Sequence, residues 1–169
     1  MAKLAGAKTE ENLRQALAEE SQLNRYLLAY ARQAELEGYP QISRLLRALA
    51  ESETVHANSD LRTLGAIKET RDNLQEATLR HTRLGQEMYP AMVRTAEEEG
   101  IRTARVTLDY ARQVELIHLE LLKQAAEHLE DLPTGEYYVC PVCGNTVFGR
   151  PPEACPICGT PGSAWMRVA

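Results

Sequence analysis

The sequence predicts a mainly α-helical protein, a four-helix bundle followed by a small metal-binding domain at the C-terminal end. The first 132 residues are rich in Ala, Leu, Glu, Gln and Arg and are interrupted by turn-forming residues at only a few places, as is typical of long helices. All four cysteines lie between positions 140 and 158. A chain of 169 residues is long enough for one bundle and one small appendage. We therefore predict two domains, residues 1–132 and residues 133–169.

Glycine and proline divide the helical part into four predicted helices. Gly38 is followed by Tyr39 and Pro40, and a helix-ending glycine before a proline that cannot continue the helix is a clear stop. Gly65 and Gly100 mark two further helix ends. The predicted helices cover residues 9–37, 41–64, 70–99 and 101–130, with a kink at Pro90 in the third and a linker at 131–135.

Two Glu-x-x-His pairs lie at matching positions in the two helical hairpins. Glu53 and Glu115 each follow a turn glycine by 15 residues, and each stands three residues before a histidine. Residues three apart share one helix face, so each pair presents a carboxylate and an imidazole side by side. Each glutamate lies roughly 22 Å beyond its turn, at 1.5 Å per residue. Two such pairs at matched distances suit two metal ions.

Two residues on the preceding helices fall at the level of these pairs. Glu20 and His81 lie roughly 27–28 Å before the glycine that ends their own helix. The alternative interpretation is that the histidines are partly buried and bonded to carboxylates without a metal. The bundle residues that we predict to bind metal are Glu20, Glu53, His56, His81, Glu115 and His118.

Two Cys-Pro-x-Cys-Gly motifs predict a four-thiolate metal site of the rubredoxin or zinc-ribbon type. Such turns direct their thiolates toward one tetrahedral ion, and both zinc and iron accept four sulfurs. The segment from Gly135 onward has only about 35 residues, so metal binding must supply much of its folding free energy. We expect iron, with zinc as the alternative, and an apolar core of Tyr138, Phe148 and Trp165. The predicted ligands are Cys140, Cys143, Cys155 and Cys158.

Together these motifs resemble the rubrerythrin family, in which a ferritin-like four-helix bundle with a di-iron centre is fused to a rubredoxin-like domain. The resemblance covers nearly the whole chain and rests on the two cysteine motifs and on Ala18-Glu-Glu20-Ser-Gln, Glu37-Gly-Tyr-Pro40, Ala50-Glu-Ser-Glu53-Thr-Val-His56-Ala, Thr70-Arg-Asp-Asn-Leu-Gln-Glu-Ala77, Glu87-Met-Tyr-Pro90 and Glu115-Leu-Ile-His118. The iron ligands that it implies are Glu20, Glu53, His56, Glu115 and His118, with Glu53 and Glu115 as bridges. It also implies reduction of hydrogen peroxide, with electrons from an external donor passed through the cysteine-bound iron to the bundle metals.

The third predicted helix departs from the family pattern. Counting back from Pro90, the family's two inward glutamates would fall where this chain has His81 and Leu84. At 100° per residue, Glu76 and Glu87 point away from the bundle axis and cannot replace them. Two ferrous ions would then leave a formal charge of roughly +1 instead of roughly −1 in a low-dielectric core. The change disfavours the ferric state and weakens binding of a second cation.

This departure leaves two functions open. The first is a peroxide reductase in oxidative-stress defence, with two irons in the bundle. The second is an electron-transfer or metal-binding protein that holds zinc, a mixed pair or a single iron in the bundle and has lost peroxidase activity. Ferritin-like iron storage has less support, because nothing in the sequence suggests a shell-forming assembly.

The connection between the second and third helices predicts a homodimer. In a ferritin-like bundle these helices run parallel, so the connection must travel the length of the bundle, roughly 35 Å. The segment from Gly65 to Thr70 reaches at most about 18 Å. We therefore expect helices 1–2 of one subunit to pack with helices 3–4 of another, which places each bundle metal site between two chains.

Charge and hydropathy limit the other partners. A net charge of −5 with mixed signs and no long Lys/Arg patch argues against nucleic acid as a partner. The N-terminal residues lack the apolar core of a signal peptide, and no stretch approaches the roughly 20 apolar residues of a membrane span. We therefore expect no membrane partner and a cytoplasmic location.

Overall fold

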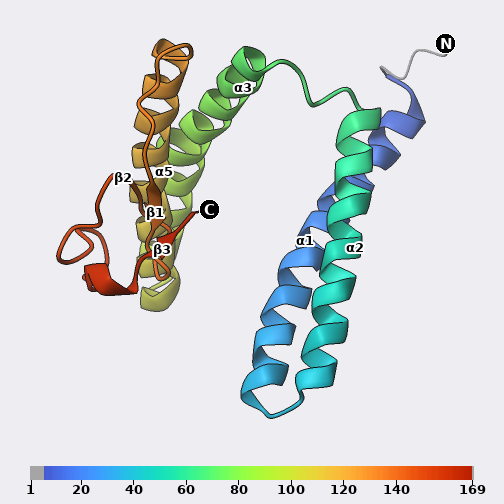
Figure 1. The fold of residues 1–169 in the computed structure, drawn as a ribbon, viewed down its shortest axis with the longest axis horizontal. Helices are drawn as coiled ribbons and strands as arrows, with labels where there is room; N and C mark the ends of the chain where they lie inside the picture. Colours follow the sequence, from blue (N-terminus) through green and yellow to red (C-terminus); the bar gives the residue numbers. More distant parts are fainter. Residues whose placement is uncertain (1–5, 169) are drawn as a thin grey trace. The chain divides into compact units, whose positions relative to one another are not determined.

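The computed structural model describes residues 6–168. It confirms the mainly helical fold and shows a small sheet in the C-terminal segment (Figure 1). The chain divides into two compact units, residues up to 68 and residues from 69 onward. The predicted domain boundary between residues 132 and 133 is a different division and stays a prediction. No helix in residues 6–168 is both long enough and apolar enough to cross a membrane.

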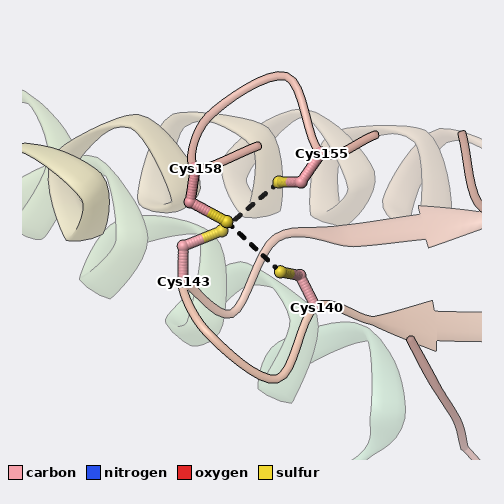
Figure 2. Close-up of side chains that lie close together, drawn as sticks. All are labelled: Cys140, Cys143, Cys155 and Cys158. Atoms are coloured by element: carbon pink, nitrogen blue, oxygen red, sulfur yellow. Dashed lines mark hydrogen bonds between the residues drawn. The ribbon is translucent and has the colours of Figure 1, made fainter. Parts of the chain in front are cut away.

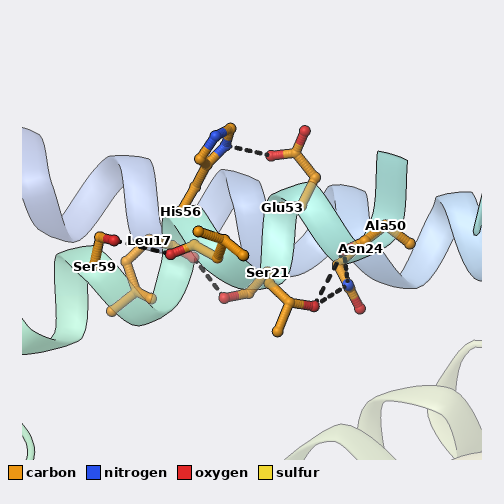
Figure 3. A network of polar contacts seen from close by, with 9 residues as sticks. Leu17, Ser21, Asn24, Ala50, Glu53, His56 and Ser59 are labelled. Carbon is orange, nitrogen blue, oxygen red and sulfur yellow. Dashed lines mark hydrogen bonds and ion pairs between the residues drawn. The ribbon is translucent and has the colours of Figure 1, made fainter. Parts of the chain in front are cut away.

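The first unit is a hairpin of two long helices, α1 (Lys8–Leu36) and α2 (Pro40–Thr63), which lie side by side (Figure 1). Small side chains at the contact let the helices approach closely, and Ala31, Ser43 and Ala50 are each at most 3% exposed. Asn24 is buried between the helices. Its Nδ2 donates to the Ala50 carbonyl at 2.7 Å and to the Thr54 hydroxyl at 2.9 Å (Figure 3). This side chain therefore links α1 to α2.

The turn of this hairpin confirms the predicted stop at Gly38. The glycine has a φ of +82°, in the left-handed region that other residues rarely adopt. Its N–H donates to the Glu35 carbonyl at 3.1 Å, and the Tyr39 N–H donates to the Ala34 carbonyl at 2.8 Å. The same pair of hydrogen bonds recurs at Gly100. The two hairpin turns that we matched in the sequence thus have the same backbone structure.

In the second unit the third predicted helix is interrupted. It consists of α3 (Thr70–Arg83), a π-helical segment η1 (Leu84–Met88) and α4 (Tyr89–Glu98). The disturbance predicted at Pro90 therefore falls in the turn just before it. Proline lacks an N–H and collides with the carbonyl four residues back, and a widened turn accommodates both effects.

The long helix α5 (Arg102–Glu127) is the element against which α3, η1 and α4 all pack. Gly85 in η1 permits the closest approach to it. A Cβ at Gly85 would lie 3.1 Å from Cδ2 of Leu116 and 3.3 Å from Cβ of Glu115. A side chain at this position would have to displace the Leu116 side chain or shift the π-helical segment by a few tenths of an ångström.

The cysteine-rich segment forms a three-stranded antiparallel sheet in the order β2-β1-β3. The strands are β1 (Tyr137–Val139), β2 (Thr146–Phe148) and β3 (Met166–Arg167), and a short 3₁₀ turn, η2, spans Gly162–Ala164. Trp165 is buried against Cys140 and Cys155. The metal-binding residues are therefore part of the small core of this segment.

The prediction for the three aromatic residues of this core was wrong at Phe148. Tyr138 packs with the buried cluster around Trp165 as expected, whereas Phe148 is 41% exposed. Successive strand residues point to opposite faces of a sheet. Tyr138 pairs with Val147 on the core face, so Tyr137 and Phe148 pair on the other face, with ring centroids 5.2 Å apart.

Gly162→Ala is predicted to destabilise the four-cysteine domain. A Cβ at this position would lie 2.1 Å from the Pro152 carbonyl oxygen, and the Gly162 N–H donates to the Glu153 carbonyl at 2.8 Å. The backbone must therefore shift, at a cost of about 1–3 kcal/mol. Faster loss of metal from the cysteines to a chelator would report the effect. Ser163→Ala is the matched control, and equal metal retention in Gly162→Ala and wild type would contradict the prediction.

Candidate metal centres

The first unit brings together three of the predicted ligands. Glu20 comes from α1, while Glu53 and His56 come from one face of α2, and their ligand atoms all lie within 4.8 Å of one another. Nδ1 of His56 is 3.4 Å from Oε2 of Glu53 (Figure 3). Oε2 of Glu20 is buried and has no hydrogen-bond partner among residues 6–168. A buried carboxylate oxygen without a partner is costly, and a cation would compensate it.

The second unit brings together the other three bundle residues. His81 on α3 lies beside Glu115 and His118 on α5, again with all ligand atoms within 4.8 Å of one another. Nδ1 of His81 is 2.5 Å from Oε2 of Glu115, yet both atoms are buried without hydrogen-bond geometry to any described residue. The rings of His81 and His118 meet edge to face at 5.4 Å between centroids. Buried lone pairs that converge in this way fit a shared metal ion.

The environment of His118 favours its neutral form. Burial lowers the pKa of its imidazole, and the nearby His81 lowers it further, while the carboxylate of Glu115 and the Gly144 carbonyl act in the opposite direction. The net pKa lies below the ordinary value. Neutral imidazole is the form that binds metal, so protons compete less strongly for this ligand.

The two clusters differ in their donor atoms. The α1–α2 cluster has two carboxylates and one imidazole, whereas the α3–α5 cluster has two imidazoles and one carboxylate. No carboxylate of α3 or η1 makes up the difference. Glu76 is paired with Arg80 at 2.8 Å on the exposed surface. Glu87 is exposed as well, as predicted. The prediction assumed 100° per residue, whereas Glu87 lies in the π-helical turn, where the rotation per residue is smaller.

The four cysteines form a single cluster (Figure 2). The Sγ atoms of Cys140 and Cys158 are 3.6 Å apart and those of Cys143 and Cys155 are 3.5 Å apart. A disulfide would require about 2.05 Å. Four sulfurs at about 2.3 Å from one zinc or iron would be roughly 3.8 Å apart in a tetrahedron. The spacing therefore fits a tetrahedral ion and not two disulfides.

Backbone amides stabilise negative charge in this cluster. Burial opposes ionisation of Cys140, but hydrogen bonds from the N–H groups of Cys143 and Val142 and from the Cys158 and Thr160 side chains lower its pKa to about 6. Burial instead raises the pKa of the Cys143 thiol. Four thiolates in one small volume repel one another unless a cation binds.

The two knuckles are built alike, and the sequence analysis missed two side chains that they position. In each, the N–H of the first cysteine donates to the carbonyl of the residue after the glycine at 2.8 Å. That residue is Asn145 in one knuckle and Thr160 in the other. Nδ2 of Asn145 lies 3.8 Å from the Cys155 sulfur, and Oγ1 of Thr160 lies 3.1 Å from the Cys158 sulfur. Their shared place after Cys-Gly was the available signal.

Comparison with known proteins gives one consistent result. Residues 11–126 match the family model described as Rubrerythrin. The chain is 35% identical to rubrerythrin-2 of Clostridium acetobutylicum, covering 90% of this chain and 92% of that protein. It is 29% identical to nigerythrin of Nitratidesulfovibrio vulgaris, covering 94% of this chain and 86% of that protein.

Solved structures of nigerythrin are similar over nearly the whole chain. The mixed-valence state and the fully reduced, all-ferrous state each align with a TM-score of 0.59 and 27% identity. Each alignment covers 99% of this chain and 90% of nigerythrin. Both the helical part and the cysteine-rich part therefore have counterparts in one protein.

Thr160→Val is predicted to lower the reduction potential of iron held by the four cysteines. In the wild type, the hydrogen bond from Thr160 to sulfur stabilises the reduced form, which is the more negative one. Valine cannot make this hydrogen bond, so reduction becomes less favourable. A hydrogen bond of about 1 kcal/mol corresponds to roughly 40 mV for one electron. Potentiometric titration of the visible band gives the value. Thr160→Ser retains the hydroxyl and should retain most of the potential, whereas an unchanged potential in Thr160→Val would show that this contact has no influence.

Proposed function

This chain belongs to the rubrerythrin family of non-haem iron proteins, and from that premise we propose that it reduces hydrogen peroxide to water. One observation carries the proposal. A single chain supplies a four-cysteine cluster and two clusters of imidazole and carboxylate ligands, and each of the latter contains a buried carboxylate oxygen without a hydrogen-bond partner among the described residues. In a histidine cluster with a purely structural role, such buried carboxylate oxygens would be expected to accept hydrogen bonds from the protein.

The three clusters would hold metal ions with different roles. Glu20, Glu53 and His56 would hold one bundle ion, and His81, Glu115 and His118 the other. Bound iron would supply the one-electron steps of the overall reaction, in which hydrogen peroxide, two electrons and two protons give two water molecules. The four cysteines would hold the ion at which an external donor delivers electrons one at a time. The donor and the cytoplasmic location remain predictions.

The α3–α5 cluster also supports a second candidate function. Two imidazoles and one carboxylate suit zinc as well as ferrous iron. The formal ligand charge is −1 in this cluster and −2 in the α1–α2 cluster, so a second iron is held less strongly here. With zinc or nothing at this position, the protein would be an electron-transfer or metal-binding protein without peroxidase activity.

We further propose that each bundle site is completed by exchange between two subunits. The first unit leaves two apolar stripes exposed, with side chains 43–54% exposed and spaced three and four residues apart. They consist of Leu23, Tyr26 and Tyr30 on α1 and of Ile42, Leu45 and Leu49 on α2. Glu20 continues the first stripe and Glu53 the second, so the ligands lie on the surface that needs a partner.

The length of the connection supports another chain as that partner. The 24 residues of α2 span roughly 36 Å. The chain from Thr63 at the end of α2 to Thr70 at the start of α3 reaches at most about 25 Å. A parallel arrangement of α2 and α3 within one bundle is therefore out of reach for a single chain, and a second copy removes this restriction.

Iron analysis and rapid reoxidation test the proposed activity. The iron-loaded protein, reduced anaerobically, should regain its visible absorption at once when hydrogen peroxide is added. Two irons per bundle would support peroxide reduction. Zinc or no metal in the bundle, with slow reoxidation, would leave only the electron-transfer or metal-binding function.

Restoring the two carboxylates should raise activity. The double variant His81→Glu and Leu84→Glu adds two negative charges to the ligands. These charges stabilise the ferric state and the binding of a second iron. We expect turnover with peroxide to rise roughly tenfold or more, equivalent to about 1.4 kcal/mol in activation free energy. His81→Gln with Leu84→Gln matches the size without the charge. No gain in a double variant that holds two irons would defeat this explanation.

Complementation tests the subunit exchange. Glu53→Ala damages the first unit and Glu115→Ala the second, so neither homodimer has an intact site. In a mixed dimer with exchanged helices, one of the two sites receives both undamaged halves, and about half of the wild-type bundle metal should return. Glu20→Ala mixed with Glu53→Ala is the control, because both damage the same unit. No recovery in verified mixed dimers would refute the exchange.

A further inference from the structure

Thr146 on β2 connects the two kinds of metal cluster within the second unit. Its Oγ1 lies 3.0 Å from Nε2 of His118 on α5. The same Oγ1 lies 3.2 Å from the carbonyl oxygen of Gly144, the residue directly after Cys143. Two hydrogen bonds therefore lead from a bundle ligand to the backbone of a cysteine knuckle, and all the residues involved lie in one compact unit.

These two hydrogen bonds determine where the proton of the neutral His118 ring lies. A carbonyl oxygen only accepts, so the single hydroxyl proton of Thr146 goes to Gly144. With its proton on the Gly144 carbonyl, the Thr146 oxygen is free to accept from Nε2 of His118, and the Gly144 carbonyl beside the same ring is also an acceptor only. Nδ1 is left with the free lone pair. A metal-binding histidine is commonly fixed in this way, with one nitrogen on the metal and the other donating to a neighbouring oxygen.

The backbone that presents Thr146 is firmly held. The Gly144 N–H donates to the Cys140 carbonyl at 3.0 Å, and the Cys140 N–H donates to the Asn145 carbonyl at 2.8 Å. Asn145 is 1% exposed. A Cβ on Gly144 would lie 3.9 Å from Cγ1 of Val114, one helical turn before the histidine on α5. The knuckle thus sits directly on the helix whose ligand it contacts.

We propose that Thr146 is a positioning residue through which the four-cysteine knuckle holds His118 as an Nδ1 metal ligand. The inference rests on the proposed metal binding by His118. It adds Thr146, which is not itself a predicted ligand. It also places the hydrogen-bonded connection between the four-cysteine site and the bundle cluster inside one subunit. That connection is therefore present whichever chain completes the bundle.

The test compares full-length wild type, Thr146→Val and Thr146→Ser, each with zinc at the four cysteines and with isotope-labelled histidine. Nitrogen NMR before further metal is added shows which ring nitrogen of His118 carries the proton. A chelator-buffered zinc titration of the His118 signals then gives the affinity of the α3–α5 cluster. Valine keeps the volume and loses the hydroxyl, while serine keeps the hydroxyl. Thr107→Val, an exposed position on the same helix, is the matched control.

We expect the proton on Nε2 in wild type and a zinc affinity roughly 10- to 100-fold lower in Thr146→Val. Thr146→Ser and Thr107→Val should remain close to wild type. A proton on Nδ1 in wild type, an unchanged affinity in Thr146→Val, or an equal loss in Thr146→Ser would overturn the role of the hydroxyl. If zinc has no effect on the His118 signals of the wild type, the proposed bundle site is wrong. The position of the ring proton is measured before this zinc is added and does not depend on that result.

Discussion

Glu115 and His118 lie three residues apart on α5, and this shared face is the constraint on which the second half of the structure depends. The same face receives His81 from α3 and the hydroxyl of Thr146 from β2. Gly85 keeps the intervening π-helical turn close to it. A shift of α5 would therefore disturb the bundle ligands and the contact with the cysteine knuckle together.

The donor atoms differ between the two bundle clusters of this protein. The α1–α2 cluster has the carboxylate-rich composition that favours hard, oxidisable iron, while the α3–α5 cluster has two neutral imidazoles and one carboxylate. The lower negative charge of the α3–α5 cluster weakens its hold on a cation and disfavours the ferric state there. In the role that we propose for Thr146, hydrogen bonding to the cysteine knuckle orients His118 before any metal binds.

In the first unit the carboxylate ligands are present, but the apolar side chains next to them are exposed. Two helices bury mainly small residues between them, with Leu27 as a large exception, and leave Leu23, Tyr26 and Leu49 substantially exposed. An exposed apolar surface of this kind is typical of a site where another protein surface packs. Metal binding and subunit association would therefore favour each other, because the same surface serves both.

The sequence by itself determined the helix ends, the Glu-x-x-His pairs and the cysteine knuckles, because each depends on neighbours a few residues away. Gly38, for example, ends a helix through its own φ and hydrogen bonds to the preceding turn. Only the tertiary structure decided that Phe148 faces away from the core, that Gly162 has no room for a Cβ, and that Thr146 meets His118. These features depend on how β2 pairs with β1, how Gly162 meets Pro152 and how β2 meets α5, and such contacts leave no pattern among neighbouring residues.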